Sequence, residues 1–163
     1  GSDPVVVLTV GRLVEKKGHA VLIAALALLP PGLNWRLVHI GGGPLDRALC
    51  RQAADAGIAD RITWLGAQPQ QRVLAAYRDA DLFTLASRIA RDGDRDGLPN
   101  VLLEAQSQGL ACVASRISAI PELIEDGETG LLVPPDDPAA LALALRTLIT
   151  DPARRAALGG AGG

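Results

Sequence analysis

Residues 5–18 read VVVLTVGRLVEKKG, an apolar run followed by a basic loop that glycines bracket. The run from Val5 to Val10 is rich in β-branched side chains and shows little polar alternation, which is typical of a strand buried on both faces. A helical stretch from Gly18 to Leu29 follows and stops at a proline pair. This strand, loop and helix predict the first unit of a parallel α/β fold.

The remainder of the chain repeats this alternation. Further strands are expected at 35–40, 61–65, 82–85 and 111–114, with a turn and an edge strand within 127–133. Further helices are expected at 45–56, 70–78, 100–108 and 121–125, with a closing helix at 138–150. This rhythm predicts right-handed crossovers and a parallel sheet covered by helices on both faces. We therefore expect one Rossmann-like α/β domain spanning residues 1–163.

Ligands of such sheets bind outside the carboxyl ends of the strands, near the switch in strand order. The loops that follow the predicted strands are therefore the candidate binding segments. They are 11–18, 41–44, 66–69, 86–99 and 115–119.

The composition limits the kinds of partner. The 16 Lys and Arg residues against 18 Asp and Glu give a net charge of −2 without a basic stripe, so no nucleic-acid partner is expected. The longest apolar run, Ala20 to Leu29, is too short to span a bilayer. Cys50 and Cys112 lack metal-ligand spacing and fall in apolar segments, which predicts two buried thiols in a reducing cytosol and no metal site.

The first two loops carry the pattern of an anion site. Arg12 and Lys17 can converge on one anion in front of the next helix, where free N–H groups and a positive partial charge add to the attraction. The alternative is a solvated basic loop, and the spacing excludes a Walker loop because no Ser or Thr follows the Lys as required. The turn Gly41-Gly42-Gly43-Pro44 brings main-chain N–H groups close to a ligand, although such turns also arise for steric reasons alone.

The acidic stretch before Asn100 allows two interpretations. Asp92, Asp94, Asp96 and Gly97 match the opening of an EF-hand loop, so a calcium-binding or interaction module that uses loop 92–97 is one hypothesis. The twelfth position of that loop is Leu103, and Glu104 comes one residue late. One helical step turns a side chain by about 100 degrees, which aims Glu104 away from the ion.

The other interpretation pairs Asp96 with Glu104, which seven residues separate. Backbone N–H groups of residues 97–100 can then meet an anion at the helix N-terminus. An acidic side chain beyond the phosphates accepts hydrogen bonds from sugar or ribose hydroxyls. A helical Glu is usually solvated, but Glu104 lies in the apolar stretch VLLEA, where leaving it unpaired is costly.

In this order the loops resemble the C-terminal nucleotide-sugar-binding domain of retaining GT-B glycosyltransferases of group 1 (family 4-like). The resemblance covers nearly the whole chain. It is carried by VGRLVEKKG (10–18), IGGGPL (40–45), ITWLG (62–66), ADLFTLAS (80–87), DGLPNVLLEAQSQGLACVAS (96–115), IPELIEDGETGLLVPPDD (120–137) and ALALRTLITDPARRAALG (142–159).

The resemblance implies roles for individual residues. Arg12 and Lys17 would hold the donor diphosphate, and Asp96, where the family usually has Glu, would contact the donor sugar with a reach shorter by one methylene. Glu104 would bind the ribose hydroxyls. The loop at Gly66 would meet the base, mainly through its main chain. The remaining donor-binding residues would be Gly11, Gly42, Gly43, Gly97, Leu98, Pro99 and Asn100.

The same resemblance implies the reaction, which is retaining, metal-independent transfer of a sugar from a nucleotide-diphosphate donor to a glycan or lipid-linked acceptor. Fixed cations and helix N-termini can stabilise the diphosphate leaving group in place of a metal, so no cofactor is expected. A GT-B nucleotide-sugar epimerase is the alternative enzyme.

The resemblance also places this chain as one half of a larger enzyme. The chain opens without Met at the first strand of the second domain, so we expect an N-terminal acceptor-binding domain of about 150–200 residues before it. We expect the isolated chain to be inactive, because the acceptor half of the site is missing. A cytoplasmic location is expected, with peripheral attachment of the full-length protein to the inner face of the membrane.

Overall fold

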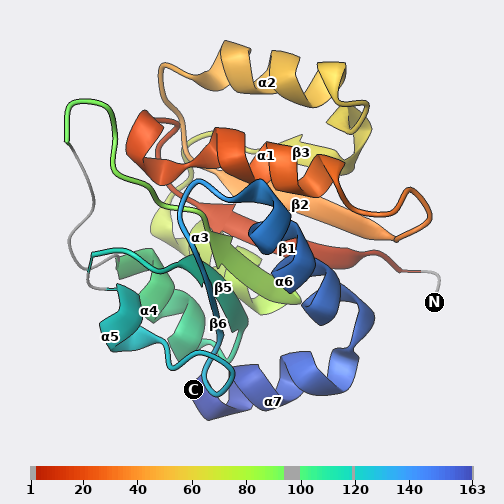
Figure 1. The fold of residues 1–163 in the computed structure, drawn as a ribbon, viewed down its shortest axis with the longest axis vertical. Coiled ribbons are helices and arrows are strands. Elements are labelled where there is room, and N and C mark those ends of the chain that lie inside the picture. Colours follow the sequence, from red (N-terminus) through yellow and green to blue (C-terminus); the bar gives the residue numbers. More distant parts are fainter. Residues whose placement is uncertain (1–2, 94–99, 119, 163) are drawn as a thin grey trace.

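The structure, a computed structural model, describes residues 3–93, 100–118 and 120–162. Its centre is a six-stranded sheet in which every pair of neighbouring strands is parallel (Figure 1). The strand order is β3-β2-β1-β4-β5-β6. The strands are β1 Val5–Val10, β2 Trp35–Ile40, β3 Ile62–Trp64, β4 Leu82–Leu85, β5 Ala111–Ser115 and β6 Leu131–Val133. The predicted Rossmann-like sheet is confirmed.

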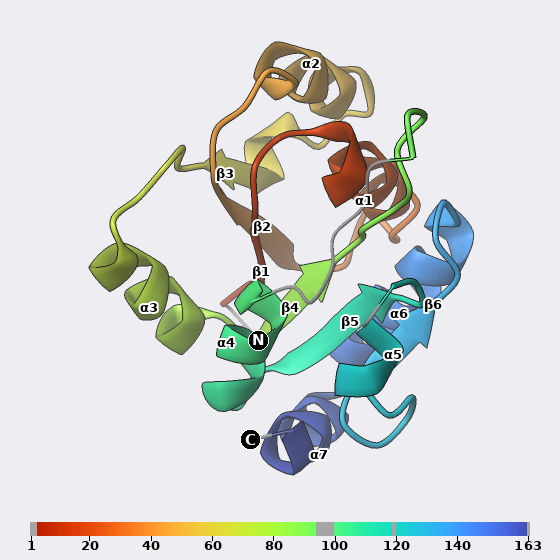
Figure 2. The same ribbon diagram turned by 90° about the vertical axis from the view of Figure 1, so that its left-hand side faces the viewer.

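Helices cover both faces of this sheet (Figure 2). One face carries α1 His19–Ala27, α2 Asp46–Asp55 and α6 Pro138–Thr150. The opposite face carries α3 Gln70–Asp79, α4 Asn100–Ser107 and α5 Ile120–Leu123. Two short 3-10 helices, η1 Glu15–Lys17 and η2 Ala59–Arg61, lie in connecting loops.

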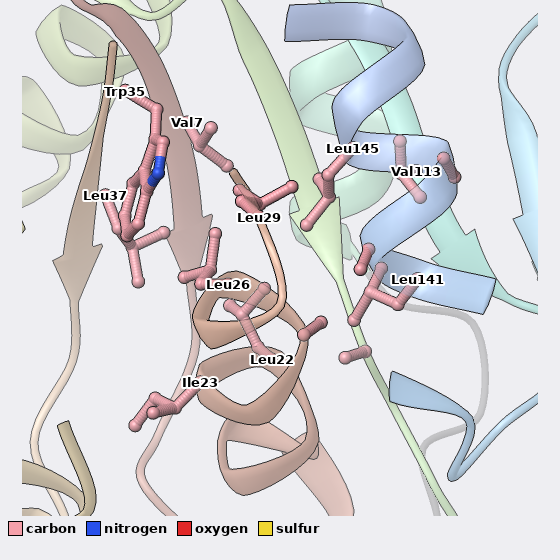
Figure 3. Packing of buried hydrophobic residues seen from close by; sticks show 14 of the residues in the cluster. Val7, Leu22, Ile23, Leu26, Leu29, Trp35, Leu37, Val113, Leu141 and Leu145 are labelled. Carbon is pink, nitrogen blue, oxygen red and sulfur yellow. The ribbon is translucent and has the colours of Figure 1, made fainter. Parts of the chain in front are cut away.

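The core is divided by the sheet into two apolar layers, because successive side chains of a strand point to opposite faces. Val7 packs with Leu22, Leu26 and Leu145 under α1 and α6 (Figure 3). The next residue, Leu8, belongs to the other layer, which includes residues of α3, α4 and α5. The two-sided burial that the β-branched run predicts therefore holds for β1.

The structure has one helix more at its C-terminal end than the sequence predicts. The helix at 138–150 does not close the chain, because α7 (Pro152–Gly162) follows it after one residue. Asp151 starts this helix by accepting a hydrogen bond from the Arg154 N–H (3.0 Å), which is the usual role of an N-cap carboxylate. Leu158 of α7 is buried in the core beside α6 and β5.

The two cysteines differ from each other. Cys112 is buried in β5, and burial raises the pKa of its thiol to about 12. Cys50 of α2 is half-exposed, so the prediction of two buried thiols is wrong for this residue. Its helix packs through Leu49 and Ala53 and leaves the neighbouring positions closer to solvent.

The strand order switches between β1 and β4. From β1 the chain proceeds to β2 on one side, and from β4 it proceeds to β5 on the other side. The loops after β1 and β4 therefore open at the switch point, where ligands of such sheets bind. Throughout the described ranges, helices lack the combined length and apolar character needed to cross a bilayer.

Candidate functional site

The loops after β1, β2 and β3 are joined by main-chain hydrogen bonds. The Gly11 N–H donates to the Ile40 carbonyl (2.9 Å), the Leu13 N–H to the Gly42 carbonyl (3.0 Å), and the Gly41 N–H to the Gly66 carbonyl (2.9 Å). Predicted donor-binding residues from three separate loops thus lie along one edge of the sheet.

A cavity of about 250 Å³ lies at this edge. Its lining includes Gly42 and Gly66, and, apart from each glycine and its chain neighbours, no atom of the described residues lies within 4 Å of the position that a Cβ would take at either residue. Their main chain is therefore open to a ligand. Gly43 differs, because a Cβ there would lie 2.7 Å from the Leu13 carbonyl oxygen. Gly43 serves the close packing of two loops.

The two predicted phosphate-binding cations lie in the loop after β1. Arg12 is exposed, and the described part of the chain gives its side chain no hydrogen-bond or ion-pair partner. The turn η1 folds the chain back, so that the alkyl chain of Lys17 lies against Gly11, 3.4 Å from the position of a Cβ there. The fold therefore brings Lys17 beside the residue that precedes Arg12.

This basic loop is also attached to the loop after β4. The Glu15 carboxylate accepts hydrogen bonds from the Arg88 guanidinium (3.1 Å) and from the Arg91 N–H (2.6 Å). The Arg88 N–H donates to the Lys16 carbonyl (2.9 Å), and the Arg88 side chain also pairs with Asp136. The start of the acidic loop is thereby held next to the basic loop at the switch point.

Sequence reasoning missed Glu15 and Arg88. Glu15 lies between Arg12 and Lys17 in the chain, but its partner comes 73 residues later. Only the strand order β1-β4 brings the two loops together.

Two buried histidines lie beneath the basic loop. His39 is fully buried, and its Nε2–H donates to the Gly11 carbonyl (2.9 Å). The ring of His19 meets that of His39 edge-on, with 4.7 Å between their centres, and the ring of Trp64 lies 5.3 Å from His39. Burial lowers the pKa of both imidazoles. For His19, burial together with the nearby His39 and Lys17 lowers the pKa to about 3.

These pKa shifts predict a loss of stability in mild acid. Below pH 6.5 the unfolded chain takes up a proton on His19, whereas the folded chain does so only near pH 3, so the free energy of unfolding falls across this interval. At about pH 5, His19 lowers the free energy of unfolding by about 2 kcal/mol relative to neutral pH. Denaturant unfolding at about pH 7.5 and pH 5 checks this in the unsubstituted chain and in His19→Leu, which should depend less steeply on pH. Equal free energies at both pH values in the unsubstituted chain would contradict it.

The predicted ribose ligand, Glu104, lies half-buried on α4. The buried Tyr77 of α3 donates a hydrogen bond from its hydroxyl to the Val101 carbonyl (3.2 Å) in the first turn of α4. Burial raises the pKa of Tyr77, and the negative charge of the nearby Glu104 carboxylate raises it further. The two helices thus place Glu104 beside a fixed hydroxyl.

Several predicted site residues fall outside the described ranges. They are Asp94, Asp96, Gly97, Leu98 and Pro99. Asn100 is described as the exposed first residue of α4. Elsewhere in the described chain, no three His, Cys, Asp or Glu side chains are grouped as a metal site would require.

Comparisons with known proteins identify the family of this chain. Residues 1–162 match the family described as "Glycosyl transferases group 1". The chain is 40% identical over 147 residues to the amylovoran biosynthesis glycosyltransferase AmsK of Erwinia amylovora, covering 90% of this chain and 36% of that protein. It is 38% identical over 164 residues to the GDP-mannose-dependent alpha-(1-6)-phosphatidylinositol monomannoside mannosyltransferase of Mycolicibacterium smegmatis, covering 99% and 43% respectively.

A solved structure can also be superposed on this chain. Alr3699/HepE of Anabaena, in complex with UDP-glucose, superposes with a TM-score of 0.87 at 27% identity, over 99% of this chain and 43% of that chain. This chain spans about two fifths of the length of the curated relatives named above. It belongs to the group 1 glycosyl transferases, and its parallel sheet with helices on both faces is the α/β fold of their GT-B structures.

Proposed function

We propose that this chain binds the nucleotide-diphosphate sugar of a glycosyltransferase and supplies the donor half of its active site. One observation carries the proposal. Arg12, exposed and without a partner in the described ranges, and Lys17, whose alkyl chain lies against Gly11, share the loop after β1 at the switch point, and this loop is hydrogen-bonded to the loop of Gly42. Two cations in a loop that leads directly into a helix, here α1 at His19, form an arrangement that suits a diphosphate.

The proposed role of the two cations is to bind the diphosphate and to stabilise it as the leaving group. Breaking the bond between the sugar and the phosphate leaves negative charge on the diphosphate. Arg12 can meet two phosphate oxygens with its planar fork, and Lys17 adds a second positive charge. Positioned cations of this kind lower the barrier without a metal ion, and we propose metal-independent transfer that retains the sugar's configuration, as the family resemblance implies.

The acidic residues complete the donor site in this proposal. Glu104 accepts hydrogen bonds from the ribose hydroxyls, and Asp96 contacts hydroxyls of the donor sugar. The backbone from Gly97 to Asn100 approaches the sugar and the phosphates at the N-terminus of α4. The support for Glu104 is its half-buried place on α4 beside the Tyr77 hydroxyl, which keeps it from being a freely solvated side chain.

Relatives suggest the classes of donor and acceptor to be tested. The name of the Mycolicibacterium relative includes GDP-mannose, and the Anabaena structure is a complex with UDP-glucose. The names of the two curated relatives refer to a polysaccharide and to a phosphatidylinositol mannoside. We propose a glycan or lipid-linked acceptor held by a second domain of the whole enzyme, which would work in the cytoplasm at the inner face of the membrane.

Glu104→Gln is expected to weaken nucleoside-diphosphate binding by about 1.5–3 kcal/mol, because the neutral amide replaces a charged acceptor for the ribose hydroxyls. Calorimetry on the purified variant checks this. Glu122→Gln, at an exposed position of α5, is the matched control and should bind as the unsubstituted chain does. Unchanged affinity in Glu104→Gln would remove this residue from the site.

Amide hydrogen exchange with UDP-glucose or GDP-mannose maps the proposed site directly. We expect one of these donors to slow exchange in residues 11–18, 41–43 and 66–68. If neither donor slows amide exchange in these loops, the proposed donor site is contradicted. A response to calcium alone, starting at Asp92 and Gly93, would favour the calcium-module hypothesis instead.

A further inference from the structure

We propose that His39 is a positioning residue of the donor site. Its imidazole holds the Gly11 carbonyl and thereby fixes the peptide that leads into Arg12. This inference rests on the proposed function, in which Arg12 binds the donor diphosphate.

The register of the sheet brings His39 to the basic loop. Thr9 of β1 pairs with His39 of β2, so this side chain lies level with the end of β1. From there Nε2 reaches the Gly11 carbonyl oxygen at 2.9 Å. A carbonyl only accepts hydrogen bonds, so Nε2 must carry the proton and donate it.

This hydrogen bond completes the restraint of the main chain on both sides of Arg12. The Gly11 N–H is already bonded to Ile40 (2.9 Å), and the Leu13 N–H to Gly42 (3.0 Å). Gly41 also passes so close that a Cβ there would lie 2.1 Å from the Gly11 carbonyl oxygen. The peptide between Gly11 and Arg12 therefore cannot rotate without losing the bond to His39.

The surroundings of His39 indicate that it serves as a hydrogen-bond donor and not only as a packing residue of the core. The ring is fully buried between His19 and Trp64, at a strand position where an apolar residue would pack without losing hydration. Within the described residues, its Nδ1 has no hydrogen-bond partner. The bond from Nε2 to the Gly11 carbonyl is therefore the polar interaction that explains a buried histidine here. Burial lowers the pKa of His39 and keeps its imidazole neutral near pH 7, and the Gly11 carbonyl fixes the single ring proton on Nε2.

The test compares variants that separate the hydrogen bond from the packing. His39→Phe keeps a ring against His19 and Trp64 but removes the donor, and we expect it to bind UDP or GDP about tenfold more weakly. His39→Gln returns an N–H near the position of Nε2 and should recover most of the affinity. Thr84→Val is the control, because it removes another buried hydrogen bond, from Thr84 to the Val113 carbonyl (3.0 Å), and should leave binding unchanged.

A double variant tests whether His39 acts through Arg12. In the Arg12→Ala background, His39→Phe should cause little further loss, because the residue that it positions is gone. If His39→Phe does not fold, His39→Leu replaces it in the same comparison. Thermal unfolding of every variant without nucleotide shows whether a loss of affinity is accompanied by a loss of folding stability.

The outcomes separate the two claims. Weak binding by His39→Phe with recovery by His39→Gln supports the positioning role. Equal binding by His39→Phe and the unsubstituted chain, while Arg12→Ala loses affinity, overturns this role and leaves the proposed function intact. Equal losses in the Phe and Gln variants also overturn it. Absence of UDP and GDP binding by the unsubstituted chain overturns the proposed function and this role together.

Discussion

Replacing Arg12 and Lys17 together by alanine is expected to weaken nucleoside-diphosphate binding at least about 100-fold. Each charge-assisted hydrogen bond contributes about 1.5–3 kcal/mol, and the two residues together supply both cations of the proposed site. The effect is large because both cations belong to the loop after β1, where the alkyl chain of Lys17 lies against Gly11, the residue before Arg12. Calorimetric or NMR titration of the double variant measures it.

A matched control separates this local effect from a change in overall charge. Arg146→Ala with Arg154→Ala also removes two positive charges, from exposed positions of α6 and α7. This control should bind as the unsubstituted chain does. Equal losses in both double variants would show that general electrostatic attraction, and not the loop after β1, governs binding.

Gly18→Ala is expected to destabilise the fold by about 4 kcal/mol, near the upper end of single-substitution effects. Gly18 has a φ of 68°, and a Cβ there would lie 1.7 Å from the Ala86 carbonyl oxygen. Both the left-handed conformation and the contact with backbone oppose a side chain. The clash falls between the loops after β1 and β4, so relief of the strain would separate the two sides of the site.

Gly127→Ala is the control for this prediction. Gly127 has a similar φ of 83°, but beyond its chain neighbours no described residue comes within 4 Å of the position that a Cβ would take there. Its substitution should cost about 1–2 kcal/mol, from the backbone conformation alone. Denaturant unfolding of both variants gives the comparison, and equal losses would refute the close approach of Gly18 to Ala86.

The sequence predicts the strands and most helices well because their signals are local. The bounds of Val5–Val10, Trp35–Ile40 and Pro138–Thr150 agree with the structure, since an apolar run or a helical stretch bounded by turn residues is read directly from the chain. Helix α7 was missed for a related reason. Asp151-Pro152 looks like a stop after α6, but the same pair caps and starts a new helix.

The contacts that form the site are long-range and could not be predicted in this way. The Glu15–Arg88 pair depends on the neighbouring places of β1 and β4, and the bond from His39 to Gly11 depends on the register of β1 and β2. Gly42 and Gly43 look alike in the sequence, yet the first opens to a cavity and the second packs against Leu13. Only the fold distinguishes a glycine that opens to a cavity from one that allows close packing.

The most direct measurement is a calorimetric titration of the purified chain with UDP, GDP and ADP, with and without calcium. We predict that one nucleotide binds selectively with a dissociation constant of about 1 mM, as suits half of a binding cleft. This binding should be independent of calcium and lost in Arg12→Ala. Binding that survives in Arg12→Ala, or a response to calcium in place of any nucleotide, would contradict the donor site proposed for this chain.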